Sequence, residues 1–145
     1  MSSFDFHASP LTSKRLSRVR SSYGSMETKL AKALWHRGIR YRRNYKKLPG
    51  SPDIAITKYK IAIFVDGEFW HGYDWDNTKN KIKKNKEYWV RKIEKNIERD
   101  IKNDNILKEL NWLVLRFWIN DLQKFFDGCV NDILDAVLSR MKNEI

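Results

Sequence analysis

Two short β-rich runs, close together in the chain, most constrain how this sequence folds. Pro52–Thr57 and Lys60–Val65 are rich in isoleucine, valine and alanine, and only two residues separate them. Such runs with so short a connection are typical of a β-hairpin. Antiparallel pairing brings the start of one strand beside the end of the other. We therefore expect Asp53 to lie next to Val65 and Asp66.

Apolar residues at helical spacing predict helices before and after this hairpin. Ser25 is a suitable N-cap for a first helix that Gly38 would end. A long helix is expected over Glu87–Leu110, where four-residue apolar spacing recurs. A closing amphipathic helix is expected over Leu122–Met141.

Two further strands complete the expected order of elements. Ile39–Lys47 alternates, and Trp112–Trp118 is a continuous apolar run of the buried kind. Residues 72–86 are expected to form a loop. The resulting order, α-β-β-β-α-β-α, predicts an α/β fold of the α+β kind. We expect one domain over residues 25–145, preceded by a basic arm over residues 1–24.

The charge of the chain favours a polyanionic partner. The formal net charge is +11, and residues 1–47 hold twelve Lys or Arg against two acids. A second run, Lys79–Trp89, contains five Lys and stands beside aromatic residues. Lysines neutralise phosphates and flat rings stack on bases, so nucleic acid is the expected partner.

A membrane or secreted setting is not expected. No apolar run approaches the roughly 18 residues needed to span a bilayer. The N-terminus lacks the apolar stretch of a signal peptide, and Cys129 is alone, so no internal disulfide can form. A cytoplasmic protein is the prediction.

Four side chains are candidates for chemistry. Asp53 and the end of the neighbouring strand could share a hard cation such as Mg²⁺, although Asp53 alone also suits a turn. His71 follows the same strand end and could accept a proton from water; the alternative is packing between its aromatic neighbours. Asp100 falls on or at the edge of the apolar face of its helix. Glu27 is explained by the first turn of its helix.

Three aromatic residues are candidates for contact with a partner. Phe69 and Trp70 are consecutive, so in an extended stretch they would point in opposite directions. At least one of them is then expected to be exposed or pressed against a partner. Trp89, at the start of the long helix, is assigned to the core by its spacing.

Three stretches resemble the very short patch repair (Vsr) DNA mismatch endonucleases, which are similar to PD-(D/E)XK nucleases. They are "PGSPDIAI", "IAIFVDGEFWHG" and "EYWVRKIEKNIERDIKNDNILKELNWLVLRFW". Together with "SKRLSRVRSSYGSMETKLAKAL", the resemblance runs from about residue 13 to about residue 120. It implies a restriction-endonuclease-like core, with a central mixed sheet flanked by helices.

The resemblance also implies roles for individual residues. Asp53 and the backbone carbonyl of Val65 would bind Mg²⁺, with Asp66 as a further candidate. His71 would activate water, and Glu27 and Asp100 would orient His71 or bound waters. The remaining candidates would contact DNA, three as a wedge in the duplex and four as cations: Phe69, Trp70 and Trp89, and Lys14, Arg15, Arg18 and Arg20.

One departure from the family concerns a structural zinc ion. Such proteins hold zinc with Cys and His around the F-W-H block, but here Glu68 stands at one expected cysteine. Tyr73 stands where a ligand is common, and Cys129 lies far away in the sequence. Four ligands are needed, so no structural zinc is expected. Tyr73 and Trp75 are expected to brace the following loop by packing.

The resemblance implies a Mg²⁺-dependent endonuclease that nicks one strand of double-stranded DNA at T:G mismatches, 5′ to the thymine. One alternative is a related restriction or homing endonuclease that acts on matched duplex. Another is a DNA-binding module without catalysis. A monomer in the cytoplasm of a bacterium or phage-infected cell is expected, with mismatch-repair proteins as further partners.

Overall fold

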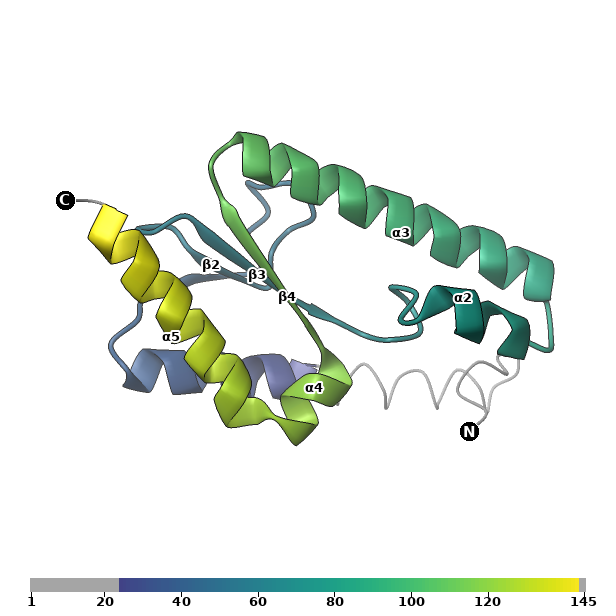
Figure 1. Cartoon of the computed structure of the whole chain (residues 1–145), viewed down its shortest axis with the longest axis horizontal. Coiled ribbons are helices and arrows are strands. Elements are labelled where there is room, and N and C mark those ends of the chain that lie inside the picture. The colour runs from purple at the N-terminus through teal and green to yellow at the C-terminus, as the bar shows by residue number, and fades with distance from the viewer. Residues whose placement is uncertain (1–23, 144–145) are drawn as a thin grey trace.

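The computed structural model of the protein describes residues 24–143 (Figure 1). In this part of the chain a four-stranded sheet has the order β1-β2-β3-β4. The pairs β1–β2 and β2–β3 are antiparallel, whereas β3–β4 is parallel. The strands are β1 (Arg42–Arg43), β2 (Ile54–Ile56), β3 (Ile61–Asp66) and β4 (Leu113–Trp118). The expected mixed sheet is therefore confirmed.

The central hairpin pairs as its sequence predicts. Ile54 lies opposite Ile63, and Ile56 lies opposite Ile61. Residues 57–60 form the turn, where Lys60 has a positive φ of 54°. All six residues of β3 are buried. A strand covered on both faces is expected to be apolar throughout, which explains the continuous hydrophobic run.

Alternation along β3 divides the core between two faces of the sheet. Ile61, Ile63 and Val65 pack with the larger cluster, to which the first helix (residues 24–36), α4 (Ile119–Lys124) and α5 (Phe126–Asn143) contribute. Ala62 and Phe64 pack on the other side with Leu107 of α3 (Lys86–Glu109). Figure 1 shows α3 along one side of the sheet and α5 across the other. Asp66 has the same parity as Ala62 and Phe64, so it belongs to the α3 face.

The chain returns from α3 to the sheet through a sharp helix end. Asn111 is left-handed, with φ 67°. Its N–H donates to the carbonyl of Lys108, and the N–H of Trp112 donates to Leu107. This pattern satisfies the last helical carbonyls and reverses the chain direction. The strand β4 can then begin at once, parallel to β3.

Four details differ from the sequence prediction. The first strand is only Arg42–Arg43, and it ends at Asn44, whose φ is 48°. The backbone N–H groups of Asn44 and Tyr45 still donate to Asp53 and Pro52, just before β2. The expected loop over residues 72–86 contains α2 (Trp75–Thr78) and the 3₁₀ helix η1 (Lys79–Lys81). The closing helix is divided between α4 and α5, at the exposed Phe125. The first helix already includes residue 24, so Ser25 is not its N-cap.

The helices of the described part are too short or too polar for a bilayer. Within residues 24–143, none is both long enough and apolar enough to cross a membrane. The expected basic arm over residues 1–24 lies outside the described residues, apart from its last residue.

Candidate active site

Asp53 and the end of β3 meet at one end of the sheet, as the hairpin predicts. The backbone N–H of Val65 donates to Oδ2 of Asp53 at 2.7 Å. The backbone carbonyl of Asp53 in turn accepts from the N–H of Asn44, at 3.0 Å. Burial raises the pKa of the Asp53 carboxyl, while the hydrogen bond from Val65 acts in the opposite direction. Asp53 is thus held firmly in a partly buried position.

Glu27, on the first helix, lies beside Asp53. Burial and the neighbouring charge of Asp53 raise its pKa from 4.5 to about 7, while the charge of Arg43 acts in the opposite direction. The guanidinium of Arg43 is the nearest cation, with its Nη2 3.9 Å from Oε2 of Glu27. Two acids side by side with so distant a cation are poorly compensated. Their oxygens suit a hard divalent cation.

His71 occupies the turn after β3 and contacts two carboxylates. Its Nδ1 is 2.6 Å from Oδ2 of Asp100 and 3.7 Å from Oδ1 of Asp66. Burial alone would lower the pKa of His71, but the hydrogen bond to Asp100 and the charges of both acids raise it. Burial acts to raise the pKa of Asp100, but the hydrogen bond and charge of His71, with the charges of Arg116 and Arg99, lower it overall. In the neutral form of the ring, Asp100 accepts a hydrogen bond from a protonated Nδ1, and Nε2 keeps its lone pair.

A glycine allows this turn to approach α3 closely. Gly72 has a φ of 70°, which side chains other than glycine rarely adopt. A Cβ at this position would lie 2.5 Å from Cδ1 of Ile97. Asp100 follows Ile97 by about one helical turn, on nearly the same face of α3. The contact between Gly72 and Ile97 therefore brings His71 within reach of Asp100.

Arg116 of β4 joins the acids on the α3 face of the sheet, and it was missed from the sequence. Its Nη1 donates to both carboxylate oxygens of Asp66, at 3.0 and 3.1 Å. Its Nε and Nη2 donate to Asp104 at 2.7–3.1 Å. The available signal was a charge within the otherwise apolar "WLVLRFW", since a cation in a buried strand needs anionic partners.

The three predicted aromatic residues form one cluster, Phe69, Trp70 and Trp89. Phe69 lies 5.1 Å from Trp70 and 5.5 Å from Trp89, and the two Trp rings are 5.7 Å apart, measured between ring centroids. Phe69 and Trp70 do not point in opposite directions, because residues 68–74 form turns and not an extended stretch. Phe69 is buried, whereas the two Trp side chains are partly exposed.

Side-chain packing braces the segment after this cluster. The rings of Tyr73 and Trp118 pack edge to face, 5.1 Å apart. Trp75 packs against the second core cluster, and its Nε1 donates to Glu94 at 3.1 Å. A carboxylate oxygen of Glu68 accepts from the backbone N–H of Asn120 at 3.0 Å. Over residues 24–143, no three His, Cys, Asp or Glu side chains are grouped to hold a metal ion.

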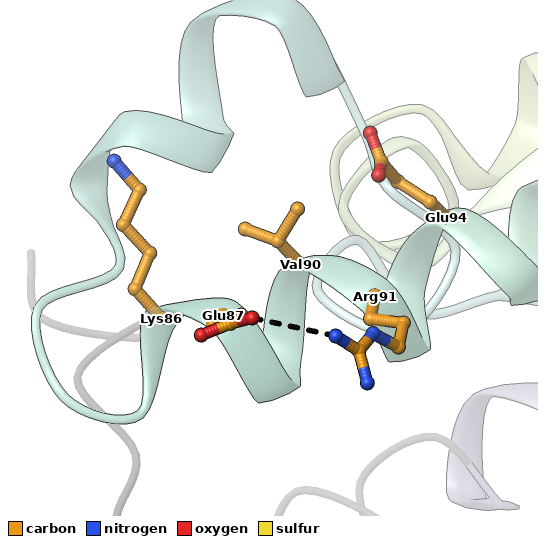
Figure 2. A pocket seen from close by; sticks show the side chains of 5 residues that line it. All are labelled: Lys86, Glu87, Val90, Arg91 and Glu94. Carbon is orange, nitrogen blue, oxygen red and sulfur yellow. Dashed lines mark hydrogen bonds and ion pairs between the residues drawn. The ribbon is translucent and has the colours of Figure 1, made fainter.

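Two of the surface hollows in the described part of the chain bear on where DNA could bind, and both lie outside this group of acids. One, of about 510 Å³, lies against the first turns of α3, and Figure 2 shows its lining, in which Arg91 pairs with Glu87. It contains none of the predicted catalytic residues. The other, of about 720 Å³, is lined by Tyr41–Lys47 and Thr57 and presents four cations: Arg42, Arg43, Lys46 and Lys47. We call these four the basic surface.

The basic surface adjoins the candidate site through two contacts. Arg43 faces Glu27, and Asn44 is hydrogen-bonded to Asp53. By contrast, the predicted DNA-binding cations of the arm lie outside the described residues: Lys14, Arg15, Arg18 and Arg20.

Known proteins resemble the chain over most of its length. Residues 4–77 match the family described as DNA mismatch endonuclease Vsr. The type II nicking enzyme V.NmeDIP of Neisseria meningitidis serogroup C is 50% identical over 111 residues, covering 77% of this chain and 75% of that protein. The type II nicking enzyme V.HpaIIP of Haemophilus parainfluenzae is 51% identical over 114 residues, covering 79% and 81%. The DNA mismatch endonuclease Vsr of Escherichia coli strain K12 is 34% identical over 134 residues, covering 90% and 85%.

Proposed function

The chain belongs to the Vsr family of DNA endonucleases, and from that premise we propose that it nicks one strand of duplex DNA at a T:G mismatch. The cut would fall 5′ to the mismatched thymine and would require Mg²⁺. The observation that carries the chemistry is the pairing of His71 with Asp100 beside the partly buried Asp53 and the buried Asp66.

Asp53 and the backbone carbonyl of Val65 are the proposed ligands of the ion. The adjacent carboxyls of Asp53 and Glu27 fit a divalent cation, because its charge would offset the burial and the mutual repulsion that together raise the pKa of Glu27. Once bound there, the ion would stabilise negative charge on the phosphate and on the leaving oxygen. Asp66 is a weaker candidate as a ligand, since Arg116 already donates to both of its oxygens.

His71 is proposed as the general base. Its Nδ1 is engaged by Asp100, so Nε2 accepts the proton of the attacking water. The ring becomes an imidazolium as the proton arrives, and the nearby carboxylates of Asp100 and Asp66 stabilise its positive charge. Glu27, beside Asp53, would orient bound water. This arrangement needs no residue outside the described part of the chain.

The basic surface and the aromatic cluster are proposed as the DNA contacts. Lys and Arg on the basic surface neutralise phosphates beside the site. The rings of Trp70 and Trp89, which are partly exposed, would enter the base stack at the mismatch, for an unstacking cost of roughly a few kcal/mol. Phe69 supports them from the core.

The test is nicking of a labelled duplex that carries one T:G pair, compared with the matched T:A duplex. We expect Mg²⁺-dependent cleavage of the thymine strand, abolished by EDTA. Asp53→Asn should lower the rate by more than about 100-fold while DNA binding is retained. Equal nicking of both duplexes would favour an enzyme for matched DNA. Binding without any nicking would favour the module without catalysis.

Trp70→Ala addresses mismatch recognition in the same assay. The preference for the T:G duplex over the matched one should fall, with the melting temperature little changed. Trp35→Ala is the matched control, because Trp35 is half-exposed on the first helix and stacks on Arg40, away from the aromatic cluster. An unchanged preference in Trp70→Ala would contradict the wedge.

A further inference from the structure

Arg116 is a mostly buried cation at the centre of the acidic side chains on the α3 face. Nη1 binds Asp66, and Nε and Nη2 bind Asp104. Nη2 also lies 3.9 Å from Oδ1 of Asp100. The guanidinium carbon is 4.0 Å from the centroid of the Phe64 ring, so the side chain is packed as well as paired.

Asp66 is buried and therefore requires a cation as its partner. It is 5% exposed, and burial raises its pKa in spite of Arg116 and His71. A buried carboxylate is stable when it is paired with a side-chain cation or coordinates a metal. Arg116 supplies the first of these, with a two-pronged contact that leaves neither oxygen without a donor.

The same pairing directs Asp66 toward His71. Oδ1 of Asp66 lies 3.7 Å from Nδ1 of His71, a longer approach than the 2.6 Å contact of that nitrogen with Asp100. Arg116 touches Asp66 directly and approaches Asp100, and its own position is set by Asp104, four residues along α3 from Asp100. The cation therefore ties β3, β4 and α3 together around the histidine.

We propose that Arg116 is a positioning residue. Its guanidinium occupies the site beside Asp66 where a metal ion could otherwise bind. Asp66 then stabilises His71, and the divalent ion binds at Asp53. The inference rests on the proposed function, because it concerns the metal and the base named there. It has two consequences that cleavage alone does not reveal. The protein without DNA binds one divalent ion, and removal of the guanidinium creates a second binding site for such an ion.

The ion count tests the first part. Mn²⁺ is titrated into the full chain without DNA, and free Mn²⁺ is followed by electron paramagnetic resonance. We expect one bound ion in the wild type and none in Asp53→Asn. Arg116→Gln should bind one ion more, because Asp66, Asp100 and Asp104 lose the cation that they share. Arg116→Gln combined with Asp66→Asn should return to one ion.

Arg116→Lys tests positioning, and it also serves where Arg116→Gln does not fold. Lysine keeps the positive charge but lacks the planar fork that contacts two carboxylates at once. We expect one bound Mn²⁺, a kcat for nicking about 10–100-fold lower and a KM for DNA within about threefold of the wild type. Arg91→Lys is the control, since Arg91 is an exposed arginine on α3 that pairs only with Glu87 among the described ion pairs.

The outcomes separate the inference from the proposed function. Wild-type kcat in Arg116→Lys, or an unchanged ion count in Arg116→Gln, would overturn the inference. So would a wild-type count of two that Asp66→Asn reduces to one. Absence of any Mn²⁺ binding to the wild type would contradict the Asp53 ion site, while the kcat and KM of Arg116→Lys would still decide the positioning role.

Discussion

At the scale of single residues, Glu27 links the stability of the protein to pH. Its pKa rises from 4.5 to about 7 in the folded chain, so folding favours its protonated form. That contribution is complete below about pH 4.5 and is lost as pH rises through about 7.

Glu27→Gln is fixed in the neutral form. In EDTA, we expect it to exceed the wild type in stability above about pH 7, by on the order of 2 kcal/mol. At about pH 4.5 the two should be similar. Thermal unfolding followed by circular dichroism at each pH measures the difference, with the exposed Glu98→Gln as control. Parallel pH profiles for Glu27→Gln and the wild type would contradict the account.

The sequence predicted those residues of the site whose positions follow from local chain geometry alone. A hairpin brings Asp53 to the end of β3 whatever the rest of the fold does, and the helical period directs Asp100 inward. Arg116 was not predictable in the same way, because its partners come from β3 and α3, which are distant in sequence. The mutual packing of Phe69 and Trp70 depends on the turn geometry, which their sequence alone does not indicate.

At the scale of elements, the turn over residues 68–74 depends on its contact with α3. Gly72→Ala would place a Cβ against Ile97 and force a left-handed conformation on alanine. We expect a loss of about 1–3 kcal/mol in the free energy of unfolding, measured in urea. Nicking should fall as well, because His71 moves relative to Asp100.

Gly128→Ala is the matched control for that substitution. Gly128 lies in α5, where an added methyl group would meet nothing within 4 Å, and alanine favours the helix. It should leave nicking unchanged and stability equal or higher, by up to about 1 kcal/mol. If both substitutions had the same effect, the close approach at Gly72 would not matter to the fold.

Elements with strong local signals were predicted well, and those shaped by contacts were not. The helix over Glu87–Leu110 and the strand over Trp112–Trp118 agree with α3 and β4 to within a residue. The short β1, α2 and the break at Phe125 depend on tertiary contacts. Ile101 is exposed although it continues the four-residue apolar spacing, because that spacing drifts around a helix with 3.6 residues per turn.

At the scale of the whole molecule, the excess positive charge predicts salt-dependent DNA binding. Lys46 and Lys47 belong to the basic surface beside the site. Replacing both with Gln should reduce the slope of log K against log salt concentration by about 2, if each contacts a phosphate. Fluorescence anisotropy with a labelled duplex measures the slope.

The control for the basic surface is a second double variant that has the same net charge as the first. Lys124→Gln with Lys142→Gln removes two exposed lysines from α4 and the end of α5. This variant should retain a slope close to that of the wild type. Equal losses in both double variants would indicate a diffuse attraction by net charge, with no preferred surface.

The spacing between Asp100 and Asp104 sets a limit on how the chain can change in length. Each residue inserted into an α-helix rotates everything beyond it by about 100°. One added residue between these two acids would swing one of them away from its partner while leaving every side chain intact. This stretch of α3 therefore tolerates replacement of its outward-facing residues better than it tolerates any insertion or deletion.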